Sequence, residues 1–156
     1  MSKDKLMVLI VGCGNIAGRF DEQRSADALP YTHAGAYHRD EHFEVVACVD
    51  PDTQRQQQFR QYWHIAQGFT KLEEVLAAGQ TYDVISICSP SATHFQDLQL
   101  AIQLRPQLIF CEKPVTYSIA ETEQIIAECA ALNILLLVNY TRAWDPACTR
   151  LKAEYA

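Results

Sequence analysis

The sequence predicts a doubly wound α/β domain, with a mostly parallel six-stranded sheet and helices on both faces. Short runs rich in Val, Ile and Leu alternate along the chain with longer segments of helical period. These short runs are apolar on both faces, which is typical of strands buried in a parallel sheet. Because a helical segment separates each pair of runs, the helices can serve as the crossovers that such a sheet requires.

The same periodicity places the individual elements. Strands are expected at 6–12, 43–50, 65–69, 82–89, 108–113 and 134–140, and helices at about 32–40, 52–63, 71–78, 92–104 and 117–132. A further helix is expected to begin at Pro146, since proline is favoured at the first helical position. Charged residues and a proline make the segment 20–31 an exposed loop between a glycine-rich turn and the first helix.

Length and composition restrict the class of protein. A chain of 156 residues with 49% hydrophobic and 21% charged residues is a single globular domain of ordinary size. Its 13 basic and 19 acidic residues, without a basic cluster, argue against nucleic acid as a partner. The start MSKDKLMVLIVGCG is too polar and then too briefly apolar for a signal peptide or a membrane span. We therefore expect a cytoplasmic protein that does not associate with membranes.

Cysteine and histidine spacing gives no sign of a metal site or of disulfides. The six cysteines contain no C-x-x-C pair, and Cys48, Cys88 and Cys111 lie within apolar runs. We expect them to be reduced and mostly buried. The five histidines lack the ligand spacing that zinc sites use, so no metal is expected.

The turn VGCGNIAG follows the first predicted strand and lies within the first β-α-β unit. Gly12 would permit the tight turn, Gly14 would let the backbone approach a pyrophosphate, and Ala17 would allow close helix packing. This G-x-G-x-x-A pattern is a variant of the dinucleotide fingerprint. A helix N-terminus at Asn15 and Ile16 would direct free N–H groups at the anion. The alternative is a strand-to-helix turn without a ligand.

Asp50 ends the second predicted strand, where a carboxylate can accept hydrogen bonds from the ribose 2′-OH of an adenosine. The insertion at 20–31 accounts for its unusually long separation from the glycines. A carboxylate at this point would repel a 2′-phosphate and so favours NAD over NADP. The alternative role is capping of the next helix, for which Asp52 competes.

Two further strand ends carry polar motifs. The segment CSPSATH follows the fourth predicted strand, and CEKPV spans the end of the fifth. Both fall at the carboxyl ends of parallel strands, the edge at which open α/β sheets bind ligands. Residues from the first, fourth and fifth strands could therefore surround one nicotinamide.

These motifs, GCGNIAG, VDPD, CSPSATH, CEKPV and VNYTRAW, taken in order, resemble the N-terminal NAD(P)-binding Rossmann domain of the Gfo/Idh/MocA oxidoreductases. That family includes glucose-fructose oxidoreductase and inositol dehydrogenase, and the resemblance spans essentially the whole chain. It implies the cofactor-binding part of a dehydrogenase that acts on a hydroxyl group of a sugar, cyclitol or related compound. The small-molecule substrate would then be a sugar or polyol.

The resemblance also assigns roles to individual residues. Lys113 would be the catalytic residue, because an ammonium beside the reacting oxygen stabilises negative charge while a neighbouring group takes the proton. Glu112 would bind near the nicotinamide ribose, and a cis peptide bond before Pro114 would aim the lysine. The complete implied cofactor site comprises Gly12, Cys13, Gly14, Asn15, Ile16, Ala17, Asp50, Pro51, Cys88, Ser89, Pro90, His94, Glu112, Lys113, Pro114 and Arg142.

Alternatives remain for several of these residues. His94 could instead be a partly buried histidine at the start of a helix. Arg142 would lie near the nicotinamide or the substrate, or have no role there. Lys113 could belong to an exposed Glu-Lys pair where a strand ends at a proline.

The family also carries a C-terminal substrate domain. We expect 1–145 to form the dinucleotide-binding domain and 146–156 to begin the helix that leads to that absent domain. The fragment would then be inactive alone and would oligomerise only through the missing part. Two other functions stay open, namely a non-catalytic NAD-binding sensor or subunit and an S-adenosylmethionine methyltransferase.

Overall fold

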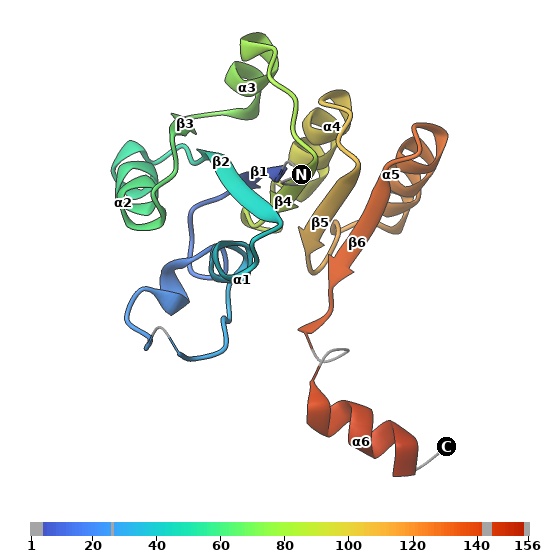
Figure 1. Ribbon diagram of the computed structural model, residues 1–156. Helices are drawn as coiled ribbons and strands as arrows, with labels where there is room; N and C mark the ends of the chain where they lie inside the picture. The colour runs from blue at the N-terminus through green and yellow to red at the C-terminus, as the bar shows by residue number, and fades with distance from the viewer. Residues whose placement is uncertain (1–4, 26, 142–144, 155–156) are drawn as a thin grey trace.

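One six-stranded sheet organises the molecule. The structure is a computed structural model, and it describes residues 5–25, 27–141 and 145–154. The strand order is β3-β2-β1-β4-β5-β6, and every pair of neighbours is parallel (Figure 1). This is the order of a doubly wound dinucleotide-binding fold, in which the strand order reverses between β1 and β4. The predicted fold class is confirmed.

The strands and helices lie within two residues of their predicted ends. The strands are β1 (Leu6–Val11), β2 (Phe43–Val49), β3 (Gln67–Phe69), β4 (Val84–Ile87), β5 (Leu108–Glu112) and β6 (Leu135–Asn139). The helices are α1 (His33–Arg39), α2 (Thr53–Trp63), α3 (Leu72–Ala78), α4 (His94–Gln103), α5 (Ile119–Ala131) and α6 (Pro146–Glu154), with a 3-10 turn at Arg19–Asp21.

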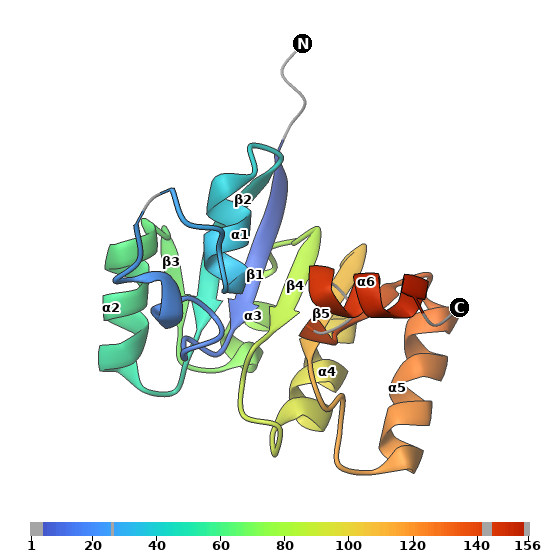
Figure 2. The same ribbon diagram turned by 90° about the horizontal axis from the view of Figure 1, so that it is seen from below.

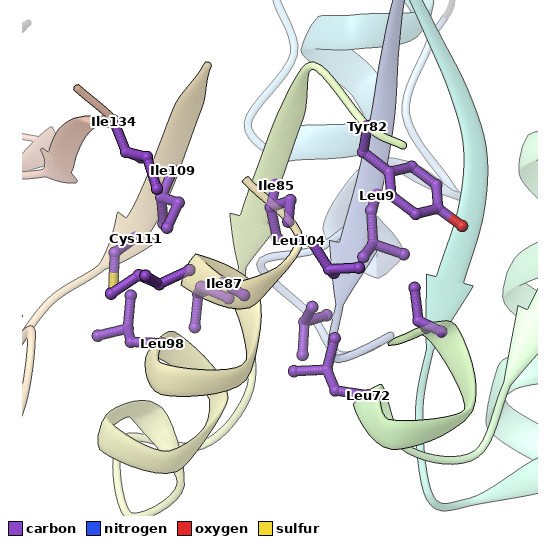
Figure 3. Packing of buried hydrophobic residues seen from close by; sticks show 14 of the residues in the cluster. Leu9, Leu72, Tyr82, Ile85, Ile87, Leu98, Leu104, Ile109, Cys111 and Ile134 are labelled. Carbon is purple, nitrogen blue, oxygen red and sulfur yellow. The ribbon is translucent and has the colours of Figure 1, made fainter. Parts of the chain in front are cut away.

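Helices pack against the sheet in two layers, with α1 and α2 on one face and α3, α4 and α5 on the other (Figures 1 and 2). Strand β1 is buried on both faces because successive side chains alternate between them. Val8 and Ile10 face α1 and α2, whereas Leu9 and Val11 join the larger cluster on the opposite face. Figure 3 shows Leu9 within this larger cluster. The continuous apolar run of β1 thus reflects its central position.

The edge strand β6 is covered less completely. Leu136 and Val138 pack against the larger cluster, but Leu135 and Leu137, which alternate with them, are 57% and 43% exposed. Within the described ranges, helices therefore cover β6 on one face only. None of the helices in these ranges is long and apolar enough to cross a membrane.

The turn after β1 brings the backbone of Gly12 against the end of β4. Gly12 has φ +88°, and its N–H donates to the carbonyl of Val49 at 2.7 Å. A Cβ at this position would lie 2.6 Å from the nitrogen of Ser89 and 2.7 Å from the carbonyl carbon of Cys88. Both the backbone angle and the close approach require glycine at this point.

The expectation of a helix N-terminus at Asn15 and Ile16 was wrong, because the first α-helix begins at His33. The N–H groups of Arg19 and Phe20 reach back five residues, to the carbonyls of Gly14 and Asn15, so this turn is wider than an α-helix. The chain then enters the inserted segment instead of continuing as a helix.

The inserted segment is an exposed loop, as predicted, and it is anchored at both ends. The carboxylate of Asp21 accepts hydrogen bonds from the N–H groups of Tyr31 and Thr32 and from the Thr32 hydroxyl, the last at 2.6 Å. The Tyr62 hydroxyl on α2 donates to the carbonyl of Glu22 at 3.0 Å. The loop therefore returns the chain to α1 in a defined position.

Replacing Gly12 by alanine is expected to destabilise the fold strongly. The added Cβ combines an unfavourable φ with a backbone clash, and such effects cost about 2–5 kcal/mol together. Gly14→Ala is the matched control, because a Cβ there meets nothing within 4 Å. Urea unfolding of both variants measures the difference. Equal stabilities for the two variants would contradict this account of the turn.

Candidate functional site

The sequence-predicted site residues that the structure describes lie at the carboxyl edge of the sheet. They lie in the segments that follow β1, β2, β4 and β5, and these strands are hydrogen-bonded neighbours in the order β2-β1-β4-β5 (Figure 1). The edge includes the point between β1 and β4 where the strand order reverses. Ligands of doubly wound folds bind at this position.

The turn after β1 presents open backbone donors. In the described ranges, the N–H groups of Gly14, Asn15 and Ile16 have no hydrogen-bond acceptor. The side chains of Cys13 and Ala17 are fully buried, so these two residues can offer only backbone to a ligand. A Cβ at Gly14 would enter open space. Free donors beside open space are the features that bind a phosphate.

Asp50 joins this turn to the end of β2. Its carboxylate is 2% exposed and accepts from the N–H of Cys13 at 2.9 Å and from the N–H of Asp52 at 2.9 Å. The Arg55 guanidinium lies 3.4 Å from the same carboxylate. Asp50 thus positions the glycine turn, and its contact with a ribose stays a prediction.

Asp52, and not Asp50, caps α2. The Asp52 carboxylate accepts from the N–H groups of Gln54 and Arg55, each at 3.0 Å. The bond from the Arg55 N–H contributes most to lowering the pKa of Asp52. The alternative of a capping role for Asp50 is therefore wrong. Pro51 is exposed between the two aspartates.

The segment after β4 is organised by Asp97, a residue that the sequence analysis missed. Its carboxylate accepts from the Ser89 hydroxyl at 2.6 Å and from the Thr93 hydroxyl at 2.7 Å. Pro90 is exposed at the edge. Burial raises the pKa of the Cys88 thiol well above its ordinary value, so Cys88 remains a neutral thiol behind the turn.

His94 ties the segment after β4 to the segment after β5. Its ring is fully buried, with Nδ1 2.8 Å from the carbonyl oxygen of Pro114 and Nε2 2.9 Å from that of Ser89. A neutral imidazole has one N–H and so donates to one of these carbonyls at a time. This placement matches the alternative of a buried histidine at a helix start. A contact between His94 and a cofactor stays a prediction.

Glu112, Lys113 and Pro114 follow at the end of β5. The peptide bond between Lys113 and Pro114 is cis, as the resemblance implied. Lys113 is exposed, and it forms no ion pair with any described residue. Burial raises the pKa of the neighbouring Cys111 thiol to about 12. Lys113 thus provides an accessible cation at the end of β5.

Glu112 is held by side chains that the sequence analysis did not assign to the site. Its Oε1 accepts from Nε2 of His33 at 3.1 Å and from Nδ2 of Asn139 at 2.7 Å. Burial raises the pKa of Glu112, but these hydrogen bonds outweigh it and hold the pKa below its ordinary value. The ionised carboxylate therefore stabilises the fold at neutral pH, and this contribution is lost as the pH falls through the lowered pKa.

The cysteines and Arg142 are the remaining residues for which the sequence predicts a state or a role. The cysteines in the described ranges are free, and all but Cys148 are buried, which confirms the prediction of reduced, mostly buried thiols. Arg142 lies outside the described residues, so its role stays a prediction.

Replacing His94 by alanine is expected to destabilise the chain by about 2–4 kcal/mol, because it removes a buried hydrogen bond to a backbone carbonyl and opens a cavity. His42→Ala is a suitable control, since the His42 side chain is 64% exposed. Thermal unfolding of both variants provides the measurement. If the two variants unfold at the same temperature, His94 does not tie the segments together.

Comparison with known proteins relates the chain to a family. The profile of the Gfo/Idh/MocA group, an oxidoreductase family with an NAD-binding Rossmann fold, matches residues 6–140. The chain is 28% identical over 112 residues to scyllo-inositol 2-dehydrogenase (NADP(+)) of Bacillus subtilis, which covers 72% of this chain and 34% of that protein. It is 39% identical over 70 residues to the uncharacterized oxidoreductase YrbE of the same organism, covering 45% of this chain and 20% of that protein.

Solved structures show the same fold at low sequence identity. The structure of the oxidoreductase YvaA of Bacillus subtilis aligns with a TM-score of 0.79 and 20% identity over 98% of this chain and 40% of that chain. The WlbA dehydrogenase of Bordetella pertussis, solved with NADH and UDP-GlcNAcA, aligns with a TM-score of 0.69 and 21% identity. The alignment covers 86% of this chain and 36% of that chain. The chain spans a fifth to a third of the two curated relatives above. With its profile match covering most of its length, the chain belongs to the Gfo/Idh/MocA oxidoreductase family and forms its NAD-binding Rossmann domain.

Proposed function

We propose that this domain binds NAD(H) for a dehydrogenase that oxidises a hydroxyl group of a sugar, cyclitol or related compound. The observation that carries the proposal is the joint presence of open backbone donors, a carboxylate and an accessible lysine at one edge of the sheet. Relatives named as scyllo-inositol and myo-inositol 2-dehydrogenases support this substrate class.

The turn from Gly12 to Ala17 would hold the pyrophosphate. Three adjacent N–H groups, those of Gly14, Asn15 and Ile16, are available to donate to an anion. Asp50 already fixes this turn through the Cys13 N–H, which keeps the donors in place before a ligand arrives. Little rearrangement is needed for binding, and this lowers its cost.

Lys113 would act at the reacting oxygen of the substrate. When bound, the nicotinamide supplies the acceptor for a hydride that leaves the alcohol carbon. The hydroxyl proton would pass to a neighbouring base or to water as the carbonyl forms, and the Lys113 ammonium would stabilise the negative charge that develops on the oxygen. Glu112 lies beside it in the chain, where its ionised carboxylate would accept a hydrogen bond from the nicotinamide ribose.

The remaining parts of the proposal concern the whole protein. About two thirds of the scyllo-inositol dehydrogenase lies outside the match. We propose that the whole protein has a further domain, which corresponds to this unmatched part of the relative. That domain would supply the residues that contact the substrate and the oligomer interface. Residues 1–145 alone would then bind cofactor but oxidise little substrate. We also propose that the protein works in the cytoplasm.

The direct test is to titrate the chain into NADH and follow nicotinamide fluorescence. The native chain is expected to bind, and Gly14→Ala is expected to weaken binding by about tenfold or more, because the new Cβ occupies the space beside the donors. An unchanged melting temperature for Gly14→Ala separates this loss from unfolding. Absence of NADH binding, together with binding of S-adenosylmethionine, would refute the proposal.

Cofactor preference provides a second test. The Asp50 and Asp52 carboxylates would repel a 2′-phosphate, so NADH is expected to bind about tenfold more tightly than NADPH. Asp50→Asn removes one negative charge and keeps a hydrogen-bond acceptor. It should bring the affinities for NADH and NADPH closer together. Asp83→Asn, at the opposite edge of the sheet, should leave the ratio unchanged. A native chain that prefers NADPH would show that Asp50 does not select the cofactor.

A further inference from the structure

A chain of buried polar side chains leads from α1 to the carboxyl edge of the sheet. Tyr37 and His33 come from α1, Ser86 from β4 and Glu112 from β5, and all four are less than one tenth exposed. The Tyr37 hydroxyl lies 2.9 Å from Ser86 Oγ, which lies 3.2 Å from Nδ1 of His33. Nε2 of His33 then reaches Glu112. We call these four residues the Glu112 network.

The chemistry of these groups indicates which one donates and which one accepts in each hydrogen bond of the network. An ionised carboxylate only accepts hydrogen bonds, so Nε2 of His33 carries the proton and donates to Glu112. In the tautomer that carries its only proton on Nε2, Nδ1 is an acceptor and can accept a hydrogen bond from the Ser86 hydroxyl. Burial raises the pKa of Tyr37 to about 12, so Tyr37 remains a donor toward Ser86. Each donor in the Glu112 network therefore has one acceptor within the network.

The geometry also distinguishes the two oxygens of Glu112. His33 and Asn139 both donate to Oε1, and no side chain in the described ranges donates to Oε2. The Phe110 ring packs against the His33 ring, with 4.7 Å between centroids and a tilt of 38°, and this contact restricts the imidazole. The His33 and Asn139 side chains thus orient the carboxylate through Oε1, the backbone N–H of Lys113 adds a further hydrogen bond to it, and Oε2 has no side-chain donor in the described ranges.

We propose that His33, together with Asn139, is a positioning residue that orients Glu112 so that Oε2 accepts a hydrogen bond from the nicotinamide ribose. This inference rests on the proposed binding of NAD(H). It gives α1, the helix after the inserted loop, a role in cofactor recognition through the buried His33 side chain. Ser86 and Tyr37 act one step further away, by setting the tautomer of His33.

Two substitutions separate orientation of Glu112 from packing of the histidine. In His33→Gln the side-chain amide can reach the place of Nε2 and still donate to Glu112. In His33→Asn the shorter amide reaches only the place of Nδ1, so contact with Ser86 is retained and contact with Glu112 is lost. His33→Asn should weaken NADH binding by about tenfold, and His33→Gln by less than about threefold.

AMP is the matched control ligand, because it has an adenosine ribose and a phosphate but no nicotinamide ribose. Its affinity should be unchanged in both variants. Asn139→Ala removes the second donor at a half-buried position and provides an independent variant, with the same selective loss for NADH expected. In the ligand-free chain, NMR titration should place the pKa of Glu112 lower in the native chain and in His33→Gln than in His33→Asn.

The outcomes distinguish the two proposals. Equal loss of NADH and AMP affinity in His33→Asn and in Asn139→Ala would overturn the positioning role in favour of a purely structural one. If His33→Asn and Asn139→Ala bind NADH as tightly as the native chain does, the positioning role is overturned as well. If the native chain binds AMP but not NADH, the proposed function fails, and this inference fails with it.

Discussion

The close approach of Gly12 to the end of β4 is the constraint on which the site depends. With its positive φ and no side chain, Gly12 lets the turn after β1 lie directly against the backbone of Cys88 and Ser89. A larger residue would separate β1 from β4 at the place where the strand order reverses. The open donors of Gly14, Asn15 and Ile16 would then no longer share one edge with the segments after β4 and β5.

Hydrogen bonds between neighbouring segments hold this edge in place without a ligand. Asp50 fastens the end of β2 to the glycine turn, and His94 fastens the segment after β4 to the segment after β5. The N–H groups of His33 and Ala34 hold the start of α1 against the carbonyls of the turn. Most of these polar groups are buried, where an unpaired partner is costly, so each bond restricts its neighbours. The arrangement suits a site that binds an extended ligand across several strand ends.

The sequence predicted most of the fold because each strand and helix carries its own local pattern. The apolar run of β1 and the glycines after it were sufficient to place the turn. Asp97 and the Glu112 network were missed, because their hydrogen bonds join residues whose relation depends on the folded chain. Ser86 within an apolar strand was a usable signal, since a buried hydroxyl needs a partner. The absence of a helix at Asn15 could not be predicted either, because the inserted loop determines where the chain leaves the turn.

Amide chemical-shift mapping with NADH tests the central claim most directly. If the carboxyl edge is a preformed cofactor site, the shifts of Gly14, Asn15, Ile16, Ser89 and Lys113 change in one saturable titration. Residues at the opposite edge, such as His42 and Gln107, should keep their shifts. Changes confined to the opposite edge or to the inserted loop would contradict the claim.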